Sequence, residues 1–142
     1  MNCNEAGLSI IKDFEKLRLE AYLPTPDDVW TIGYGHTRGV EEGDTCTEEE
    51  ADDWLKEDLH HVEVCLDQSL SCPLTSNEYS ALCCLVYNIG ATQWLKSSLR
   101  KFLMDGDYDR AANEFPRWNK QKGVVKQGLV RRRQSEKELF ET

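Results

Sequence analysis

The sequence predicts a mostly helical α+β domain with one small β-hairpin near its N-terminus and one central buried helix. Three observations lead to this prediction. Apolar residues recur at helical spacing through most of the 142 residues. Two capping boxes mark helix starts. A single early stretch combines β-branched and aromatic residues around a Pro/Asp turn, which indicates a hairpin.

A chain of this length suits one domain with a core of its own. We expect a single domain over residues 1–142, with a small β-containing lobe at about 19–46. The helical lobe is expected at about 47–142, packed with the N-terminal helix. No run reaches the roughly 18 apolar residues of a membrane span, so stable membrane association is not expected.

The first helix is predicted over residues 5–18, because apolar side chains recur at near-helical spacing at Leu8, Ile11, Phe14 and Leu17. Residues 19–37 change character. Two short β-prone segments, 19–23 and 29–34, flank the turn formed by residues 24–28. We therefore expect a hairpin directly after the first helix.

Capping boxes at Thr47–Glu50 and Thr75–Glu78 each open a helix. The second of these helices is apolar on most sides and ends at Gly90, so it is predicted to be the central buried helix. Further helices are expected around 93–104, 108–114 and 128–140, with breaks at Gly106 and Pro116.

The net charge of −9 hides an asymmetry, since the first 71 residues hold 18 acids and 5 bases. A basic stripe without any acid lies between positions 117 and 133 and comprises Arg117, Lys120, Lys122, Lys126, Arg131, Arg132 and Arg133. We interpret it as a solvated helix face, with a polyanionic partner as the alternative. Nucleic-acid binding is not expected, because the pI is about 4.8 and only Trp118 interleaves the stripe.

The six cysteines do not have the spacing of a metal site, and we expect neither a metal nor another cofactor. Cys83 and Cys84 lie in an apolar helix and are interpreted as small buried hydrophobes. Cys65 and Cys72 are predicted to be close enough to form a disulfide across a short connection, with two free thiols as the alternative.

Glu15 is the candidate catalytic residue that the pattern singles out. It follows Ile11 by four positions, so it extends the apolar stripe of the first helix. Burial there would raise the pKa of the carboxyl and keep a proton available for general acid catalysis. The alternative is a boundary glutamate that pairs with Arg18 or Lys12.

The run Thr31-Ile32-Gly33-Tyr34-Gly35-His36-Thr37 resembles the signature of the phage-type lysozymes, glycoside hydrolase family 24. The resemblance continues in the same order through segments 14–19, 21–22, 54–58, 73–75, 87–90, 117–120 and 128–133, so it covers nearly the whole chain. It implies a lysozyme-like fold and a muramidase that cleaves the β-1,4 bond between N-acetylmuramic acid and N-acetylglucosamine, with inversion. The alternative is a catalytically degenerate saccharide-binding or structural module.

The family's constellation implies that Glu15 is the acid and that Thr31 holds the attacking water. An aspartate belongs between them, but this hairpin is one residue longer than expected. Thr25, Asp27 and Asp28 remain as alternatives for that role, and the two aspartates could instead serve only the turn.

The same resemblance implies that Thr37, Tyr87 and Ser98 line the saccharide cleft, and that His36 pairs with Asp58. Such a pair would raise the pKa of the histidine. The implied role is that of a phage endolysin whose partner is the glycan of peptidoglycan. We expect a monomer without a signal peptide, held in the host cytoplasm until the inner membrane is breached.

Overall fold

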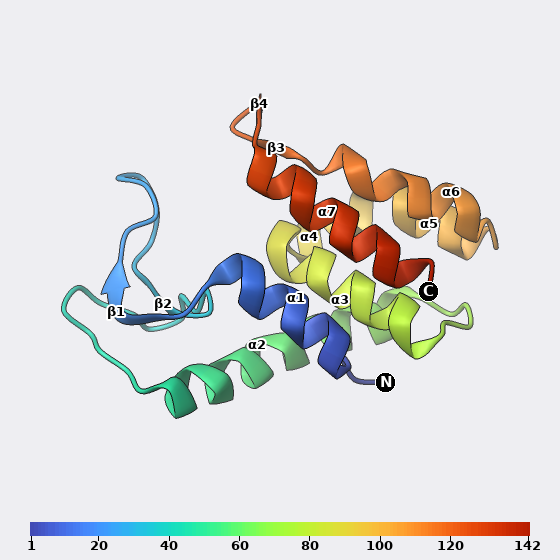
Figure 1. Ribbon diagram of the computed structural model, residues 1–142. Helices are drawn as coiled ribbons and strands as arrows, with labels where there is room; N and C mark the ends of the chain where they lie inside the picture. The colour runs from blue at the N-terminus through green and yellow to red at the C-terminus, as the bar shows by residue number, and fades with distance from the viewer.

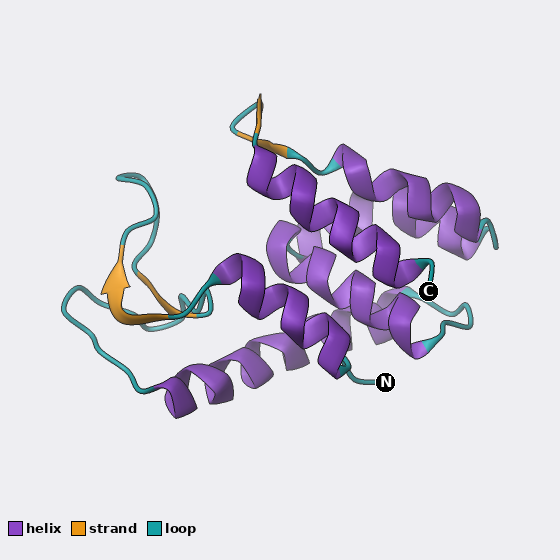
Figure 2. Ribbon diagram, viewed as in Figure 1, coloured by secondary structure: helices purple, strands orange, loops and turns teal.

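The computed structural model describes residues 1–142 and shows a mainly helical molecule with two small antiparallel sheets (Figure 1, Figure 2). The predicted α+β class is confirmed. In chain order the elements are α1 (Glu5–Glu15), β1 (Arg18–Tyr22), β2 (Thr31–Gly33), α2 (Glu48–Ser69), α3 (Ser76–Ile89), α4 (Ala91–Lys96), α5 (Ser98–Met104), α6 (Tyr108–Glu114), the 3₁₀ helix η1 (Phe115–Arg117), β3 (Lys120–Gln121), β4 (Val124–Val125) and α7 (Gln127–Phe140).

The predicted central helix is α3, which packs against α1, α2, α4 and α7. Every residue from Tyr79 to Val86 is buried, as expected of a helix that is apolar on most sides. The capping box of Thr75 and Glu78 forms both of its hydrogen bonds, and the helix ends at Gly90, whose φ is 88°. Figure 1 shows α3 between α1 and α7, so helices from both ends of the chain cover it.

The first helix is shorter than predicted. It ends at Glu15 rather than near residue 18, because Lys16 adopts a left-handed φ of 59° and Arg18 already belongs to β1. Glu15 is therefore the last helical residue, at the point where the chain leaves the helical body for the hairpin. This position places its side chain at the junction between the two parts of the molecule.

The predicted hairpin is formed by β1 and β2, which pair antiparallel with Arg18 opposite Gly33 and Tyr22 opposite Thr31. Helix α2 then leads from the loop beyond the hairpin back to the helical body (Figure 1). It begins with the predicted capping box at Thr47, both hydrogen bonds of which are present. Its buried face includes Ala51, Leu55, Leu59 and Leu66.

Two elements differ from the prediction. The single helix expected over 93–104 is divided into α4 and α5, because the Ser97 hydroxyl donates to the Trp94 carbonyl and accepts from the Arg100 amide. Ser97 thereby ends one helix and caps the next. The β3–β4 hairpin was not predicted. Its turn is made by Lys122 and Gly123, with φ of 51° and 79°.

The predicted bridge between Cys65 and Cys72 is absent, since all six cysteines are free. Cys65 faces the large cleft on one side of α2, together with His61. Cys72 lies in a separate cavity with Leu66. The two residues therefore border different cavities, although the segment that connects them in the sequence is short. No helix has the combination of length and apolarity required to span a membrane.

Candidate active site

A cleft of about 700 Å³ lies between the β1–β2 hairpin and the helical body. Its lining comes from the end of α1, the β1–β2 hairpin and the segment after it, α2, the end of α3, the start of α4, and β3. Six of the side chains that line it are polar and bear on the chemistry discussed below: Glu15, Asp28, Thr31, Thr37, Tyr87 and Gln121. An elongated polar ligand with many hydroxyl groups would find hydrogen-bonding partners along this surface.

Glu15 lies in this cleft, with 21% of its side chain exposed. Its Oε1 accepts a hydrogen bond of 2.7 Å from Nη1 of Arg132, a residue of α7 that is 117 positions away. The sequence interpretation missed this partner. Of the two alternatives considered, Lys12 pairs with Asp52 instead, and the Arg18 guanidinium lies over an aromatic ring of its own strand.

The approach of Glu15 to the hairpin depends on a glycine. Gly35 has a φ of 86°, and a Cβ placed on it would lie 2.9 Å from Oε2 of Glu15. A side chain at this position would strain the backbone and displace the carboxylate. The presence of glycine at position 35 of the Thr31–Thr37 run therefore has a steric explanation.

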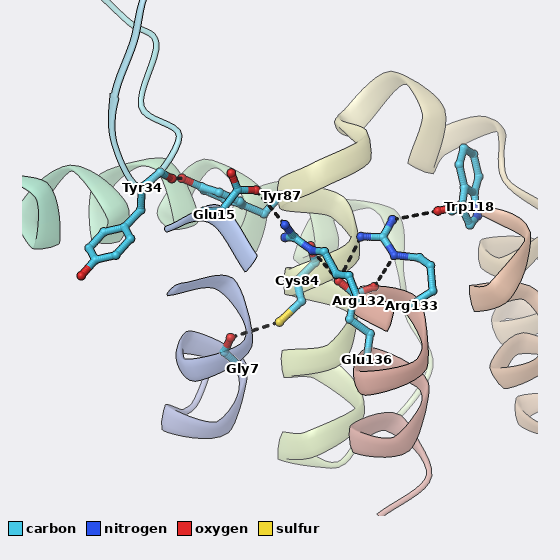
Figure 3. Close-up of polar contacts among 9 residues, drawn as sticks. All are labelled: Gly7, Glu15, Tyr34, Cys84, Tyr87, Trp118, Arg132, Arg133 and Glu136. Atoms are coloured by element: carbon cyan, nitrogen blue, oxygen red, sulfur yellow. Dashed lines mark hydrogen bonds and ion pairs between the residues drawn. The ribbon is translucent and has the colours of Figure 1, made fainter. Parts of the chain in front are cut away.

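Arg132 belongs to a buried ion cluster, which we define as Glu15, Arg132, Arg133 and Glu136 (Figure 3). Nε of Arg132 donates to Glu136 at 3.1 Å, and Nη2 donates to the Cys84 carbonyl of α3 at 3.0 Å. Arg133 reaches the same Glu136 carboxylate, at 2.8 Å from Nε and 3.2 Å from Nη2. Three acceptors thus fix the orientation of the Arg132 guanidinium.

The prediction that the basic stripe is a solvated helix face is wrong for two of its members. Arg132 and Arg133 are 3% and 1% exposed. Burial lowers the pKa of Arg132, but the carboxylates of Glu136 and Glu15 outweigh this, and the net pKa lies above its ordinary value. Burial lowers the pKa of Arg133 and raises that of Glu136, and in each case the opposite charge limits the change.

Thr31 lies in β2 at the floor of the cleft and is 5% exposed. Its hydroxyl donates to the Val29 carbonyl at 3.0 Å. Because the proton is used in that bond, the oxygen lone pairs remain to accept a hydrogen bond from a ligand or a water molecule.

The three alternatives for the second acidic position have different surroundings. Asp28 lines the cleft, whereas Thr25 and Asp27 are not among its lining residues. The Thr25 hydroxyl donates to Oδ2 of Asp28 at 3.2 Å. Asp27 is 82% exposed and accepts from Lys122 of the β3–β4 turn at 3.3 Å. Asp28 is therefore the carboxylate of this loop that borders the same cleft as Thr31.

Tyr87 and Thr37 both line the cleft. The Tyr87 hydroxyl donates to the Tyr34 carbonyl at 2.6 Å and so ties α3 to the hairpin segment (Figure 3). Burial raises the pKa of Tyr87, and the nearby carboxylates of Glu15 and Asp58 raise it further. Tyr87 is thus a neutral donor at the wall of the cleft.

Ser98 is not among the residues that line this cleft. It is exposed at the start of α5 and borders a separate cavity beside Arg117 and Trp118. The reason is the break at Ser97, which begins a new helix where the sequence predicted a continuous one.

His36 lies against α2. Its Nδ1 is 2.8 Å from Oδ2 of Asp58, and its ring stacks on Trp54 with centroids 4.7 Å apart and an interplanar angle of 7°. Its backbone forms two hydrogen bonds of 2.9 Å with Ile32. His36 is 6% exposed and connects the hairpin segment to α2.

Sequence reasoning missed the roles of Arg132 and Glu136. A signal was present, because Glu136 follows Arg132 and Arg133 by four and three positions, the spacings at which helical side chains pair. The contribution of Gln121 to the cleft depends on the unpredicted β3–β4 hairpin, and no local pattern indicates it.

Comparisons with known proteins bear on this site. The family model described as phage lysozyme matches residues 12–136. An endolysin of Acyrthosiphon pisum secondary endosymbiont phage 1 is 45% identical, over 100% of this chain and 99% of that protein. An endolysin of Bacillus phage B103 is 39% identical over 100% of this chain, which spans 55% of that longer protein. The muramidase domain of SpmX from Asticaccaulis excentricus is similar in structure, with a TM-score of 0.92 and 36% identity over 99% of this chain and 98% of that domain.

Proposed function

The chain belongs to the phage lysozyme family, and on that premise we propose that it is an endolysin, a muramidase that hydrolyses the β-1,4 bond between N-acetylmuramic acid and N-acetylglucosamine in bacterial peptidoglycan. The observation that carries the assignment to this site is Glu15. Its carboxylate lies in the cleft and is held by a buried guanidinium that does not line the cleft itself.

Glu15 is proposed as the general acid. In its protonated form it donates to the glycosidic oxygen as the bond to the sugar breaks, because a sugar alkoxide without a proton is a poor leaving group. The carboxylate that remains is then stabilised by the hydrogen bond from Arg132. Tyr87 is uncharged, and because its hydroxyl proton is donated to the Tyr34 carbonyl, its oxygen can accept a hydrogen bond from a sugar hydroxyl nearby.

Thr31 and Asp28 are proposed to act on the opposite side of the reaction. The lone pairs of Thr31 Oγ1 can position the attacking water, since the hydroxyl proton is bonded to Val29. Asp28 supplies the carboxylate that accepts a proton from that water, and Thr25 orients it. This assignment chooses Asp28 over Asp27, whose carboxylate pairs with Lys122 outside the cleft.

We propose that the reaction inverts the anomeric configuration, as the resemblance implies. Attack by water opposite the leaving group on a β-linked sugar yields the α-anomer first. Proton NMR of the reducing ends during the first minutes of digestion tests this. Initial appearance of the β-anomer would show a retaining reaction instead.

The decisive experiment for the site is Glu15→Gln. Glutamine keeps the size of the side chain but cannot donate the proton, so the rate of clearing of outer-membrane-permeabilised Gram-negative cells should fall by roughly 10²- to 10⁴-fold. Glu20→Gln is the matched control, because Glu20 is an exposed glutamate of β1 that does not line the cleft. A folded Glu15→Gln protein that clears cells at the wild-type rate would refute the assignment.

We also propose that the enzyme acts as a monomer, since the residues assigned to the reaction all come from one chain. Its proposed compartment before lysis is the host cytoplasm. Six free cysteines are compatible with a reducing environment. Recovery of the intact protein from the periplasm of cells whose inner membrane is undamaged would contradict this localisation.

A further inference from the structure

Glu136 is a carboxylate with no contact to solvent and no place in the cleft. It is 0% exposed, lies on α7, and is not among the residues that line the cleft. Burial of a charged carboxylate is unfavourable unless its partners are close, and both partners here are guanidinium groups. The contacts of these two guanidinium groups, from Arg132 and Arg133, should therefore explain why a carboxylate is buried here.

Glu136 contacts the one guanidinium that reaches the catalytic acid. Arg132 uses Nε for Glu136, Nη1 for Glu15 and Nη2 for the Cys84 carbonyl, so its three nitrogens point at three different acceptors (Figure 3). A guanidinium is planar, and fixing Nε fixes the direction of both terminal nitrogens. The bond to Glu136 thus determines where Nη1 meets Glu15.

Glu136 also balances charge. With Glu15 protonated, as catalysis requires, the cluster of Arg132, Arg133 and Glu136 carries one net positive charge. Without the Glu136 carboxylate it would carry two, next to the residue that must hold a proton. A buried positive charge favours the ionised form of a neighbouring carboxylic acid. Loss of Glu136 would therefore favour the inactive, deprotonated form of Glu15.

From this geometry we propose that Glu136 is a positioning residue, which acts through Arg132 to hold Glu15 in place and limits the positive charge beside it. This inference rests on the proposed function of Glu15. The titratable and charged groups around Glu136 and Glu15 come from three helices. Arg132 and Arg133 belong to α7, Cys84 and Tyr87 belong to α3, and Glu15 itself ends α1.

Glu136→Gln tests the proposal, with initial rates of hydrolysis of purified peptidoglycan measured between pH 4 and pH 9. The turnover rate at pH 7 should fall on the order of 10- to 100-fold, because a small displacement of a catalytic group has effects of that size. The KM should change little, since Glu136 does not line the cleft. The alkaline limb of the pH–rate profile should move to lower pH by about one unit or more.

Glu114→Gln is the matched control. Glu114 is a second buried glutamate, 6% exposed, and it pairs with Arg117 at 2.9 Å away from the cluster. Its substitution removes a buried charge of the same kind, so it should lower stability without moving the pH–rate profile. A merely structural role for Glu136 would give the same result as this control.

A second background keeps the test informative if Glu136→Gln alone does not fold. In Arg133→Met, Glu136 faces a single guanidinium, and adding Glu136→Gln removes one charge of each sign. The double variant should have its alkaline limb at lower pH than Arg133→Met. Superimposable profiles in either background would overturn the proposal. If Glu15→Gln remained active, the proposed function itself would fail, and the two failures are therefore distinguishable.

Discussion

The carboxylate of Glu15 is confined by two neighbours of different kinds. On one side the Arg132 guanidinium donates to Oε1 at 2.7 Å. On the other side Gly35 leaves room for Oε2 only because it lacks a Cβ. The hydrogen bond from Arg132 and the space left by Gly35 together define one position for the carboxylate that we propose as the proton donor, and that position lies in the cleft. Substitutions at the residue scale should therefore separate electrostatic from steric contributions.

Asp28→Asn is expected to reduce lysis strongly, by roughly 10²-fold or more, because it removes the cleft carboxylate that we propose accepts the proton of the attacking water. Asp27→Asn is the matched control, since it changes the neighbouring residue and breaks only an exposed ion pair with Lys122. Exposed pairs of this kind contribute about 0–1 kcal/mol. Turbidity assays on both proteins decide the matter, and a larger loss in Asp27→Asn would transfer the role to that residue.

Gly35→Ala is expected to lose activity beyond its effect on stability. The new Cβ would meet Glu15 Oε2 at 2.9 Å and force the carboxylate away from Arg132. Gly39→Ala provides the comparison, because its φ of 72° imposes a similar backbone strain with no atom within 4 Å. Both should be destabilised by about 1–2 kcal/mol in urea. Equal lytic activity in the two variants would argue against the steric role.

At the scale of elements, each helix that was predicted with its correct start has a local signal for that start. The capping boxes at Thr47 and Thr75 appear in the structure with both hydrogen bonds. These bonds satisfy amide groups that would otherwise lack partners at the N-terminus of the helix. The cap of α2 lies where the chain passes from the hairpin lobe into the helical body, so it fixes the start of the helix at that connection.

Thr47→Ala should lower the free energy of unfolding by about 1 kcal/mol, with an upper range near 2, since it removes the side-chain acceptor of the Glu50 amide. Thr47→Ser is the control that retains the hydroxyl. Urea denaturation followed by circular dichroism measures both. A Thr47→Ala protein as stable as wild type would mean that water replaces the cap at no cost.

Local signals also explain which parts of the molecule could be predicted from the sequence. The hairpin of β1 and β2, the central helix and the cleft positions of Glu15 and Thr31 follow from turn residues, periodicity and the resemblance of the Thr31–Thr37 run. The partner of Glu15 could not be found this way. Arg132 is 117 positions distant, and no spacing rule connects residues on helices that meet only in the folded core.

Other errors have the same origin. The end of α1 at Glu15 depends on a left-handed Lys16, which is uncommon for a residue other than glycine. Cys65 and Cys72 border different cavities, which the short segment between them in the sequence does not reveal.

At the scale of the whole molecule, the two ends of the chain share one core. Helix α1 packs on α3 and α7, and the segments between them supply the rest of the fold (Figure 1). The hairpin lobe and the β3–β4 turn approach each other at Asp27 and Lys122. The reactivity of the thiols can be used to test this packing, because Cys3 of the N-terminal segment lies beside Cys83 and Cys84 of α3.

Thiol labelling is expected to divide the six cysteines by location. The neighbouring Cys83 and Cys84 thiols lower the pKa of the half-buried Cys3 thiol and outweigh the opposing effect of burial, so Cys3 should react first with a small alkylating reagent. Cys83 and Cys84 are 0% exposed, and the adjacent Cys3 together with burial raises their pKa, so they should react only on unfolding. Mass spectrometry after timed quenching measures both phases. A fast phase that persists in Cys3→Ser would contradict the assignment.

The long sequence separation between Glu15 and Arg132 has a consequence for the biosynthesis of the protein. Glu15 leaves the ribosome long before its guanidinium partner, because Arg132 follows it by 117 positions. Domains fold as units during synthesis. A nascent chain therefore carries Glu15 without its Arg132 partner until α7 has been synthesised. Glycan-cleaving activity should appear only once α7 is present, rather than grow gradually with chain length.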